Sequence, residues 1–270
     1  MAMVHYSIIM PERNAAPDVE RRLGELYAVF AGLGKPYEIL CVDDGSTAEH
    51  RQRLKALLDT HPCLRLLLIE RAAGLSAALG AGIAAARGEV AIALEAGGQY
   101  PAAEIARLIR RLARADAVFG CRRLSATRRT LRRLAQLPRR LLFGQTVRDA
   151  DCLFWAARHE AVAGLILARG MHRHLPDMIA RRGFRVGEIH VDHCAAAPQT
   201  IPPEPWPSPR AMFAVWRSRR LASCAVTEIA PRRTDRSGGK CTRIDPPQPL
   251  GRRGNGPSDA QRGDRRNTTA

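Results

Sequence analysis

The chain has 270 residues, of which 46% are apolar, so it can form one large domain or two small ones with a buried core. Its formal net charge of +17 favours anionic partners such as nucleotides, phospholipid headgroups or nucleic acid, without choosing among them. The first residues lack a basic segment followed by a long apolar run, and no clean stretch of about 20 apolar residues exists, so we expect neither a signal peptide nor a membrane-spanning helix.

Strand-like and helix-like segments alternate along the first half of the sequence. Near-continuous apolar runs predict strands at residues 5–11, 37–44, 64–70, 89–95 and 116–122. Helices are predicted at 17–33, 48–59, 75–86 and 102–114, with Pro101 as the first residue of the last one. This order predicts an α/β fold with a mostly parallel sheet, helices on both faces, and a ligand site beyond the carboxyl ends of the strands.

The composition changes after residue 195. Residues 196–226 are rich in proline and predict a linker with a short helix over 210–222. Residues 227–270 contain almost no large apolar side chains and predict a disordered basic tail. The catalytic or binding domain is therefore expected to span residues 1–195.

The seven cysteines are widely spaced and form no C-x-x-C pair. This pattern is typical of reduced thiols in a cytosolic protein, several of them in core strands. It disfavours a structural zinc site.

Polar residues stand where the predicted strands end, among them Glu12, Arg13 and Asn14. The most specific short signal is "VDDGST", in which two carboxylates, Asp43 and Asp44, leave a buried strand. A carboxylate at this point can accept hydrogen bonds from a nucleobase or a ribose hydroxyl. The same residues also make a good Asx-turn or helix N-cap, so both interpretations stay open.

Several segments resemble the family 2 glycosyltransferases, and most of all their polyprenyl (dolichyl) phosphate mannosyltransferase type. The similarity runs from about residue 6 to residue 193. It is carried by "SIIMPERN", "YEILCVDDGST", "RAAGLSAALGAGIAAARGEVAIALEAGGQYP", "ADAVFGCRR", "RDADC" and "MHRHLPDMIARRGFRVGEIHVDH". The resemblance implies the glycosyltransferase A fold, which is Rossmann-like.

The resemblance also implies roles for seven residues. Those expected to contact the nucleotide are Pro11, which begins the loop over the base, Asp43, Asp44 and Gln99. Those expected to act in catalysis are Glu95, Arg122 near the diphosphate, and Asp149 in the acceptor region. Glu95 takes the first position of an Asp-x-Asp metal element, so it would also hold Mg²⁺ or Mn²⁺.

The sequence departs from the family pattern at several of these elements. Gly97 replaces the second carboxylate of the metal element, so the ion is expected to bind weakly or not at all. Arg13 and Ala15 replace an aromatic residue and a glutamate, and residues 153–155 and 194–195 also differ from the pattern. Arginines such as Arg13, Arg122 and Arg123 are candidates to neutralise the diphosphate instead.

The resemblance implies transfer of a hexose from GDP-mannose or a UDP-sugar to a polyprenyl phosphate, at the cytoplasmic face of a membrane. A lipid phosphate is already ionised at neutral pH, so the reaction needs no general base. The alternative is a catalytically impaired or inactive family member that binds a nucleotide or a membrane, because residues 95–97 read Glu-Ala-Gly.

Two further features were open to more than one interpretation. The arginine-rich segment at 122–140 fits an anionic membrane surface, an ordinary solvated helix or, least well, nucleic acid, since aromatic residues make up only 5% of the chain. His172 and His174 would lie on opposite sides of a helix, which disfavours a shared metal. They fit either a site or a helix-cap or surface role. His190 and His193 belong to a further strand-like run, "FRVGEIHVDH", and are expected to be structural.

Overall fold

The computed structural model describes residues 4–123, 147–194, 201–202, 204 and 226–229. The strands are β1 (Tyr6–Glu12), β2 (Tyr37–Asp44), β3 (Leu64–Ile69), β4 (Val90–Ala93), β5 (Ala117–Arg122), β6 (Trp155–Arg158), β7 (Val186–Val191) and β8 (Val226–Ile229). The α-helices are α1 (Ala16–Leu33), α2 (Ala48–Leu57), α3 (Leu75–Ala85), α4 (Ile105–Arg111), α7 (His159–Val162) and α8 (Leu175–Arg181). Two 3₁₀ turns, η1 (Ala102–Glu104) and η2 (Met171–His174), precede α4 and α8.

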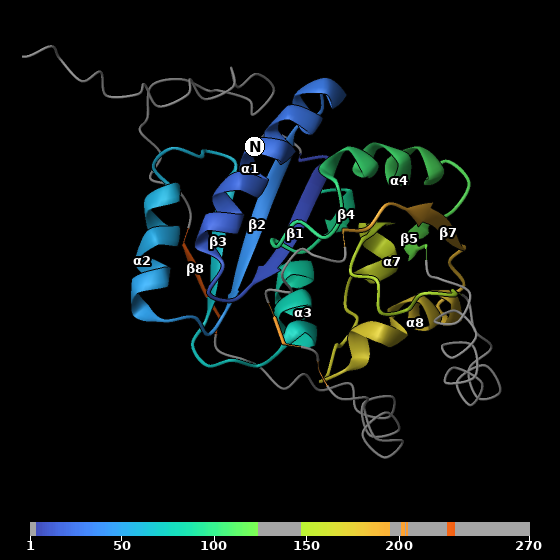
Figure 1. The fold of residues 1–270 in the computed structure, drawn as a ribbon. Coiled ribbons are helices and arrows are strands. Elements are labelled where there is room, and N and C mark those ends of the chain that lie inside the picture. Colours follow the sequence, from blue (N-terminus) through green and yellow to red (C-terminus); the bar gives the residue numbers. More distant parts are fainter. Residues whose placement is uncertain (1–3, 124–146, 195–200, 203, 205–225, 230–270) are drawn as a thin grey trace, which may run out of the picture.

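Within the described residues the strands form one mixed sheet in the order β7-β5-β6-β4-β1-β2-β3-β8 (Figure 1). The predicted parallel sheet is confirmed for the pairs β1–β2, β2–β3, β1–β4 and β5–β7. Two strands missing from the prediction, β6 and β8, are antiparallel to their neighbours. The predicted helix at 102–114 divides into η1 and α4 and ends at Arg111.

Helices cover both faces of the sheet, as predicted, and each face has its own apolar core. Buried residues of α1, α2 and α4 belong to one core cluster, and those of α3, α7 and α8 belong to the other. Helix α3 lies close to β1, since a Cβ at Gly82 would stand 2.3 Å from a methyl carbon of Ile9. A helix rich in alanine and glycine can approach the sheet this closely.

Parts of the predicted linker and tail pack on the sheet formed by the predicted domain. Ile201 is 3% exposed and belongs to the same core cluster as α3. Thr227–Ile229, predicted as disordered, lie in β8, where the Glu228 carboxylate accepts a 2.9 Å hydrogen bond from Arg65 Nε. Such a short edge strand is specified by its partner strand rather than by its own pattern. The predicted helix at 210–222 and the tail from residue 230 lie outside the described residues.

Two general expectations are also tested by the described residues. Cys41, Cys121, Cys152 and Cys194 form no disulfide, but Cys63 is disulfide-bonded, so the prediction of reduced cysteines is wrong for Cys63. Spacing along a sequence cannot reveal which thiols meet in a fold. Among the described helices, none combines the length and the hydropathy that a membrane crossing requires.

Candidate active site

The carboxyl ends of β1, β2, β4 and β5 meet at one edge of the sheet. Glu12 is paired in register with Asp43 at the ends of β1 and β2. Glu95 follows β4 by two residues, and Arg122 is the last residue of β5. The fold therefore brings the polar strand ends to one edge, as the sequence predicts.

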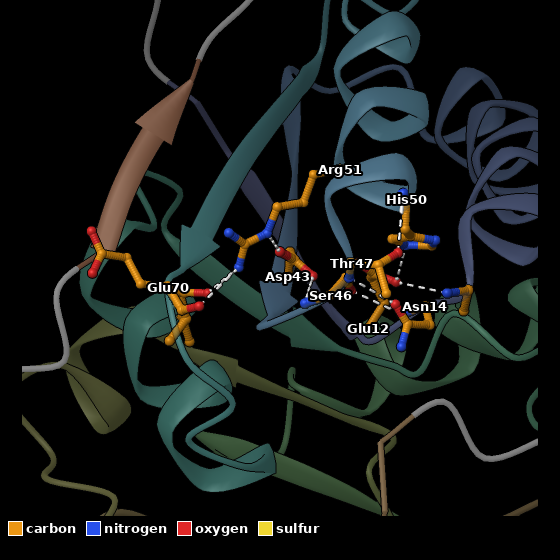
Figure 2. A network of polar contacts seen from close by, with 10 residues as sticks. Glu12, Asn14, Asp43, Ser46, Thr47, His50, Arg51 and Glu70 are labelled. Carbon is orange, nitrogen blue, oxygen red and sulfur yellow. Dashed lines mark hydrogen bonds and ion pairs between the residues drawn. The ribbon is translucent and has the colours of Figure 1, made fainter.

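The loops after β1 and β2 are joined by a network of hydrogen bonds (Figure 2). The Asp43 Oδ1 atom accepts a 3.0 Å hydrogen bond from the Ser46 backbone N–H, and Oδ2 accepts a 2.7 Å bond from Arg51 Nε. The Asn14 backbone N–H donates to Ser46 Oγ at 2.9 Å, and Asn14 Oδ1 accepts from the Thr47 N–H at 3.1 Å. The turn interpretation of this motif is thus confirmed for Asp43.

Asp44 holds the start of α3. Its carboxylate accepts backbone hydrogen bonds from Ala73 at 2.7 Å and from Gly74 at 3.0 Å. The turn between β2 and α2 needs Gly45, whose φ is +72° and whose Cβ, if present, would lie 2.3 Å from the backbone nitrogen of Ala72. Asp43 is 0% exposed and Asp44 is 1% exposed, and both carboxylates bind backbone N–H groups of neighbouring loops. Their contact with a nucleotide stays a prediction.

Glu12 and His50 form a buried pair beside Asp43. No role was predicted for His50. Glu12 Oε2 lies 2.9 Å from His50 Nε2 and accepts a 3.1 Å hydrogen bond from the Ala15 N–H. Burial, together with the charges of Asp43 and Asp44, raises the pKa of Glu12 to about 8, although the Ala15 hydrogen bond acts against this. Burial lowers the pKa of His50. At neutral pH Glu12 therefore carries a proton and can donate it in a hydrogen bond to Asp43.

Glu95 points an oxygen into the interior without a partner. Its side chain is 5% exposed, and Oε2 has no hydrogen-bond partner within the described residues. Burial raises the pKa of Glu95 to about 7, and the charge of Arg122 acts in the opposite direction. Gly97 offers no side chain, and the described residues contain no group of three His, Cys, Asp or Glu side chains that could hold a metal. Of the three residues of the predicted metal element, only Glu95 offers a carboxylate.

Arg122 and Asp149 are brought together by the fold. Arg122 Nε donates to Asp149 Oδ2 at 2.7 Å, and Nη2 donates to Oδ1 at 2.9 Å. The backbone N–H of Arg122 adds a third bond to Oδ2 at 3.1 Å. Burial opposes the charge of Arg122, but the Asp149 carboxylate outweighs it and raises the pKa of the guanidinium. This two-point contact fixes the plane of a permanent cation at the site.

Pro11 and Gln99, the other two residues predicted to contact the nucleotide, make contacts within the fold itself. Pro11 does not begin a loop, because it is buried inside β1 and pairs in register with Val42. The Gln99 carbonyl accepts a 2.8 Å bond from the backbone N–H of Cys194. Next to it, the ring of Tyr100 stacks on Phe154 with centroids 5.2 Å apart. These contacts hold the turn that carries Glu95 against the segment after β7.

The two histidines of η2 are buried, so a surface role for them is wrong. His172 Nδ1 lies 2.8 Å from Ser76 Oγ, and His174 is the N-cap residue of α8. The side chain of His174 makes no capping hydrogen bond there, so the predicted helix-cap role stays a prediction. Of the arginine-rich segment, Arg122 is paired and Arg123 is exposed, whereas residues 124–146 lie outside the described residues.

The sequence matches a known family. The model of "Glycosyl transferase family 2" matches residues 7–175. An undecaprenyl-phosphate 4-deoxy-4-formamido-L-arabinose transferase of Pseudomonas paraeruginosa is 32% identical over 198 residues, covering 71% of this chain and 58% of that protein. A transferase of the same name from Pectobacterium carotovorum is 27% identical over 194 residues, covering 69% and 59%. The chain thus spans less than two thirds of the length of these relatives.

Solved structures share the fold. A mannosyltransferase of Pyrobaculum calidifontis in complex with GDP-Man and Mn²⁺ matches with a TM-score of 0.55 and 23% identity, over 72% of this chain and 57% of that one. Glucosyl-3-phosphoglycerate synthase of Mycobacterium tuberculosis in complex with Mn²⁺ and UDP-glucose matches with a TM-score of 0.57 and 19% identity, over 81% and 79%. At these identities the likeness concerns the fold alone, and it confirms the predicted glycosyltransferase A fold.

Proposed function

Because the chain belongs to glycosyl transferase family 2, we propose that it transfers a sugar from a nucleoside diphosphate sugar to a polyprenyl phosphate. The names of the curated relatives support the lipid phosphate acceptor, and the GDP-Man and UDP-glucose complexes of the structural neighbours support the donor class. The observation that carries the proposal is the partly buried pair of Arg122 and Asp149 at the strand ends, where the charge of Arg122 acts against the burial that raises the pKa of Glu95.

The nucleoside lies, in this proposal, against the joined loops after β1 and β2. The oxygens of Asp43 and Asp44 already accept hydrogen bonds from their own loops. A carboxylate oxygen has a second lone pair, so each group can also accept one bond from the base or the ribose. Pro11 is buried in β1, whereas Gln99 is half-buried, and its contact with the nucleotide belongs to this proposal.

Arg122 stabilises the leaving group. An oxygen of the lipid phosphate forms a bond with the anomeric carbon, while the bond from that carbon to the β-phosphate oxygen breaks. The departing nucleoside diphosphate keeps the electron pair and gains negative charge. Asp149 holds two edges of the Arg122 guanidinium, so the cation stays oriented as that charge develops.

A divalent ion would fit this site only in part. A bound Mg²⁺ or Mn²⁺ would neutralise charge on the departing diphosphate. The buried Oε2 of Glu95 is free to hold such an ion, whereas Gly97 supplies nothing beyond its backbone. The other ligands would therefore be diphosphate oxygens and water, an arrangement that Mg²⁺ accepts.

The donor sugar and the cellular setting belong to the proposal as well. The sequence favoured a hexose, whereas the names of the relatives specify 4-deoxy-4-formamido-L-arabinose, so both sugar types are candidates. An enzyme whose acceptor is a lipid must act at a membrane face, and the net charge of +17 supports binding of this chain to an anionic surface. We place the protein at the cytoplasmic face, where nucleotide sugars are expected.

The test is a transfer assay with the full chain and undecaprenyl phosphate in detergent. Each reaction receives one donor, either with Mn²⁺ or with a chelator; the donors are GDP-mannose, UDP-glucose and UDP-4-deoxy-4-formamido-L-arabinose. The lipid product is identified by mass spectrometry. We expect a sugar-phosphate lipid from one donor. Absence of product from all three, in a preparation that binds none of the nucleotides, would contradict the proposal.

A second candidate is a family member that binds without turnover. The observation in its favour is Gly97, which removes a carboxylate from the position where the metal element of the family has one. The same assay separates the two, because nucleotide binding without any lipid product supports this candidate alone.

A further inference from the structure

His193 lies beside Arg122, in the segment that follows β7. Strands β5 and β7 are parallel, and Val191, the last residue of β7, is paired in register with Arg122, the last residue of β5. A strand advances about 3.3 Å per residue, so the chain after Val191 continues past the end of β5. His193 therefore belongs to the carboxyl edge of the sheet, where the proposed site lies.

Two contacts hold this segment against the turn that carries Glu95. The backbone N–H of Cys194 donates a 2.8 Å hydrogen bond to the Gln99 carbonyl. The ring of His193 lies against that of Tyr100, with centroids 5.3 Å apart and the planes tilted by 54°. Tyr100 is 2% exposed, so it gives the histidine ring a buried support on one side. The ring is thereby placed between this turn and the end of β5.

The groups that face the His193 ring keep it neutral. Burial and the positive charge of Arg122 lower its pKa, and the Asp149 carboxylate, which is paired with Arg122, offsets this only in part. Burial raises the pKa of Tyr100, so the group packed on the ring is uncharged at neutral pH as well. A proton on His193 would place a second cation beside Arg122, and the neutral ring is therefore the stable form at neutral pH.

The hydrogen-bonding groups of this ring match a hydroxyl group. His193 is half-buried, and neither ring nitrogen forms a hydrogen bond with a residue that the structure describes. A neutral imidazole offers one N–H donor and one acceptor nitrogen, and a hydroxyl group likewise donates once and accepts. An ionised phosphate only accepts, and Arg122 already supplies a cation for it. The ring therefore fits the hydroxyl groups of a sugar better than a phosphate.

We propose that His193 is a specificity-determining residue, which forms a hydrogen bond with a hydroxyl group of the donor sugar while Arg122 faces the diphosphate. This inference rests on the proposed function. In the donor the sugar is bonded to the β-phosphate, so a ring beside Arg122 lies on the sugar side of that phosphate. The inference gives a binding role to a histidine that the sequence predicted to be structural.

The first test needs no ligand. The full chain with ¹⁵N-labelled histidine is titrated with acid and followed by NMR, and His193→Phe identifies the His193 signals. We expect a neutral ring at pH 7. In Arg122→Gln the pKa of His193 should rise, because the positive charge is removed and the Asp149 carboxylate loses its partner. A pKa that is the same in both proteins would show that the ring does not lie beside Arg122, and would overturn the inference.

The second test is calorimetric titration of the full chain with the three donors of the transfer assay, and with UDP and GDP. His193→Phe keeps a ring against Tyr100 but has no ring nitrogen, and His190→Phe makes the same change at an exposed position of β7. We expect His193→Phe to bind the donor about tenfold more weakly and to bind the sugar-free nucleoside diphosphate as the unmodified protein does. His190→Phe should change neither affinity.

The outcomes of this titration separate the inference from the proposed function. An equal loss of affinity for donor and nucleoside diphosphate in His193→Phe, or no loss for either, would overturn the role of His193 and leave the proposed function standing. An unmodified protein that binds none of these nucleotides would contradict the proposed function, and the inference with it.

Discussion

Replacing Glu12 with glutamine should make the protein more stable at high pH. Glu12 is 0% exposed, and its pKa is raised from 4.5 to about 8, first by burial and then by the two aspartates beside it. Glutamine keeps an acceptor for the Ala15 N–H and a donor toward Asp43, as the protonated acid does. It carries no charge at any pH, so nothing is lost when the pH rises.

The size of the effect follows from proton linkage. Between pH 4.5 and about 8 the folded chain keeps the Glu12 proton while the unfolded chain releases it, so stability falls as pH rises. Each pH unit in this range lowers the free energy of unfolding by about 1.4 kcal/mol. The total loss of stability has an upper limit of about 5 kcal/mol at and above pH 8. Below pH 4.5 this penalty is absent, because both states are protonated.

The assay is urea unfolding of the unmodified protein and Glu12→Gln between about pH 5 and pH 9. The free energy of unfolding of the variant, relative to the unmodified protein, should grow steadily with pH and level off above pH 8. Glu20→Gln, which removes an exposed carboxylate from α1, should follow the unmodified protein. Parallel curves for Glu12→Gln and the unmodified protein would refute the reasoning.

Three further predictions concern the site and its frame. Arg122→Lys loses the two-point contact with Asp149 and should lower the transfer rate on the order of 10²–10³-fold in steady-state assays, and a rate near that of the unmodified protein would exclude Arg122 from catalysis. Gly97→Asp places a second carboxylate beside Glu95 and should tighten Mn²⁺ binding about tenfold in calorimetry without donor, whereas unchanged affinity would argue against a metal at Glu95. Gly45→Ala forces a side chain into a backbone with φ of +72° and should cost about 1–3 kcal/mol in thermal unfolding, and an equal melting temperature would show that the turn relaxes freely.

Much of the fold was predictable because its central elements carry strong local patterns. The strand at 37–44 has the predicted bounds, since a continuous apolar run followed by two carboxylates leaves little choice. Strand β6 has only four residues, and β8 likewise, so neither shows a period of its own. Their strand conformation depends on hydrogen bonds to β4, β5 and β3, which a local pattern does not contain.

The candidate site was predictable only where a motif carried it. Glu95, Arg122 and Asp149 were identified by resemblance, but the pairing of Arg122 with Asp149 joins residues 27 positions apart and appears only in the fold. His50 gave no signal, because one histidine on a short helix looks the same whether it faces solvent or Glu12. Glu204 stands among prolines, and its local sequence does not show that its carboxylate accepts hydrogen bonds from the backbone N–H groups of Ser76 and Gly170.

The central claim is that the carboxyl edge of the sheet binds a nucleotide. The most direct test is calorimetric titration of the full chain with UDP and with GDP, each in the presence and absence of Mn²⁺, repeated on Arg122→Lys. The account predicts saturable binding of one nucleotide that is weakened in the variant. Equal binding by the unmodified protein and the variant, or no binding of either nucleotide, would contradict it.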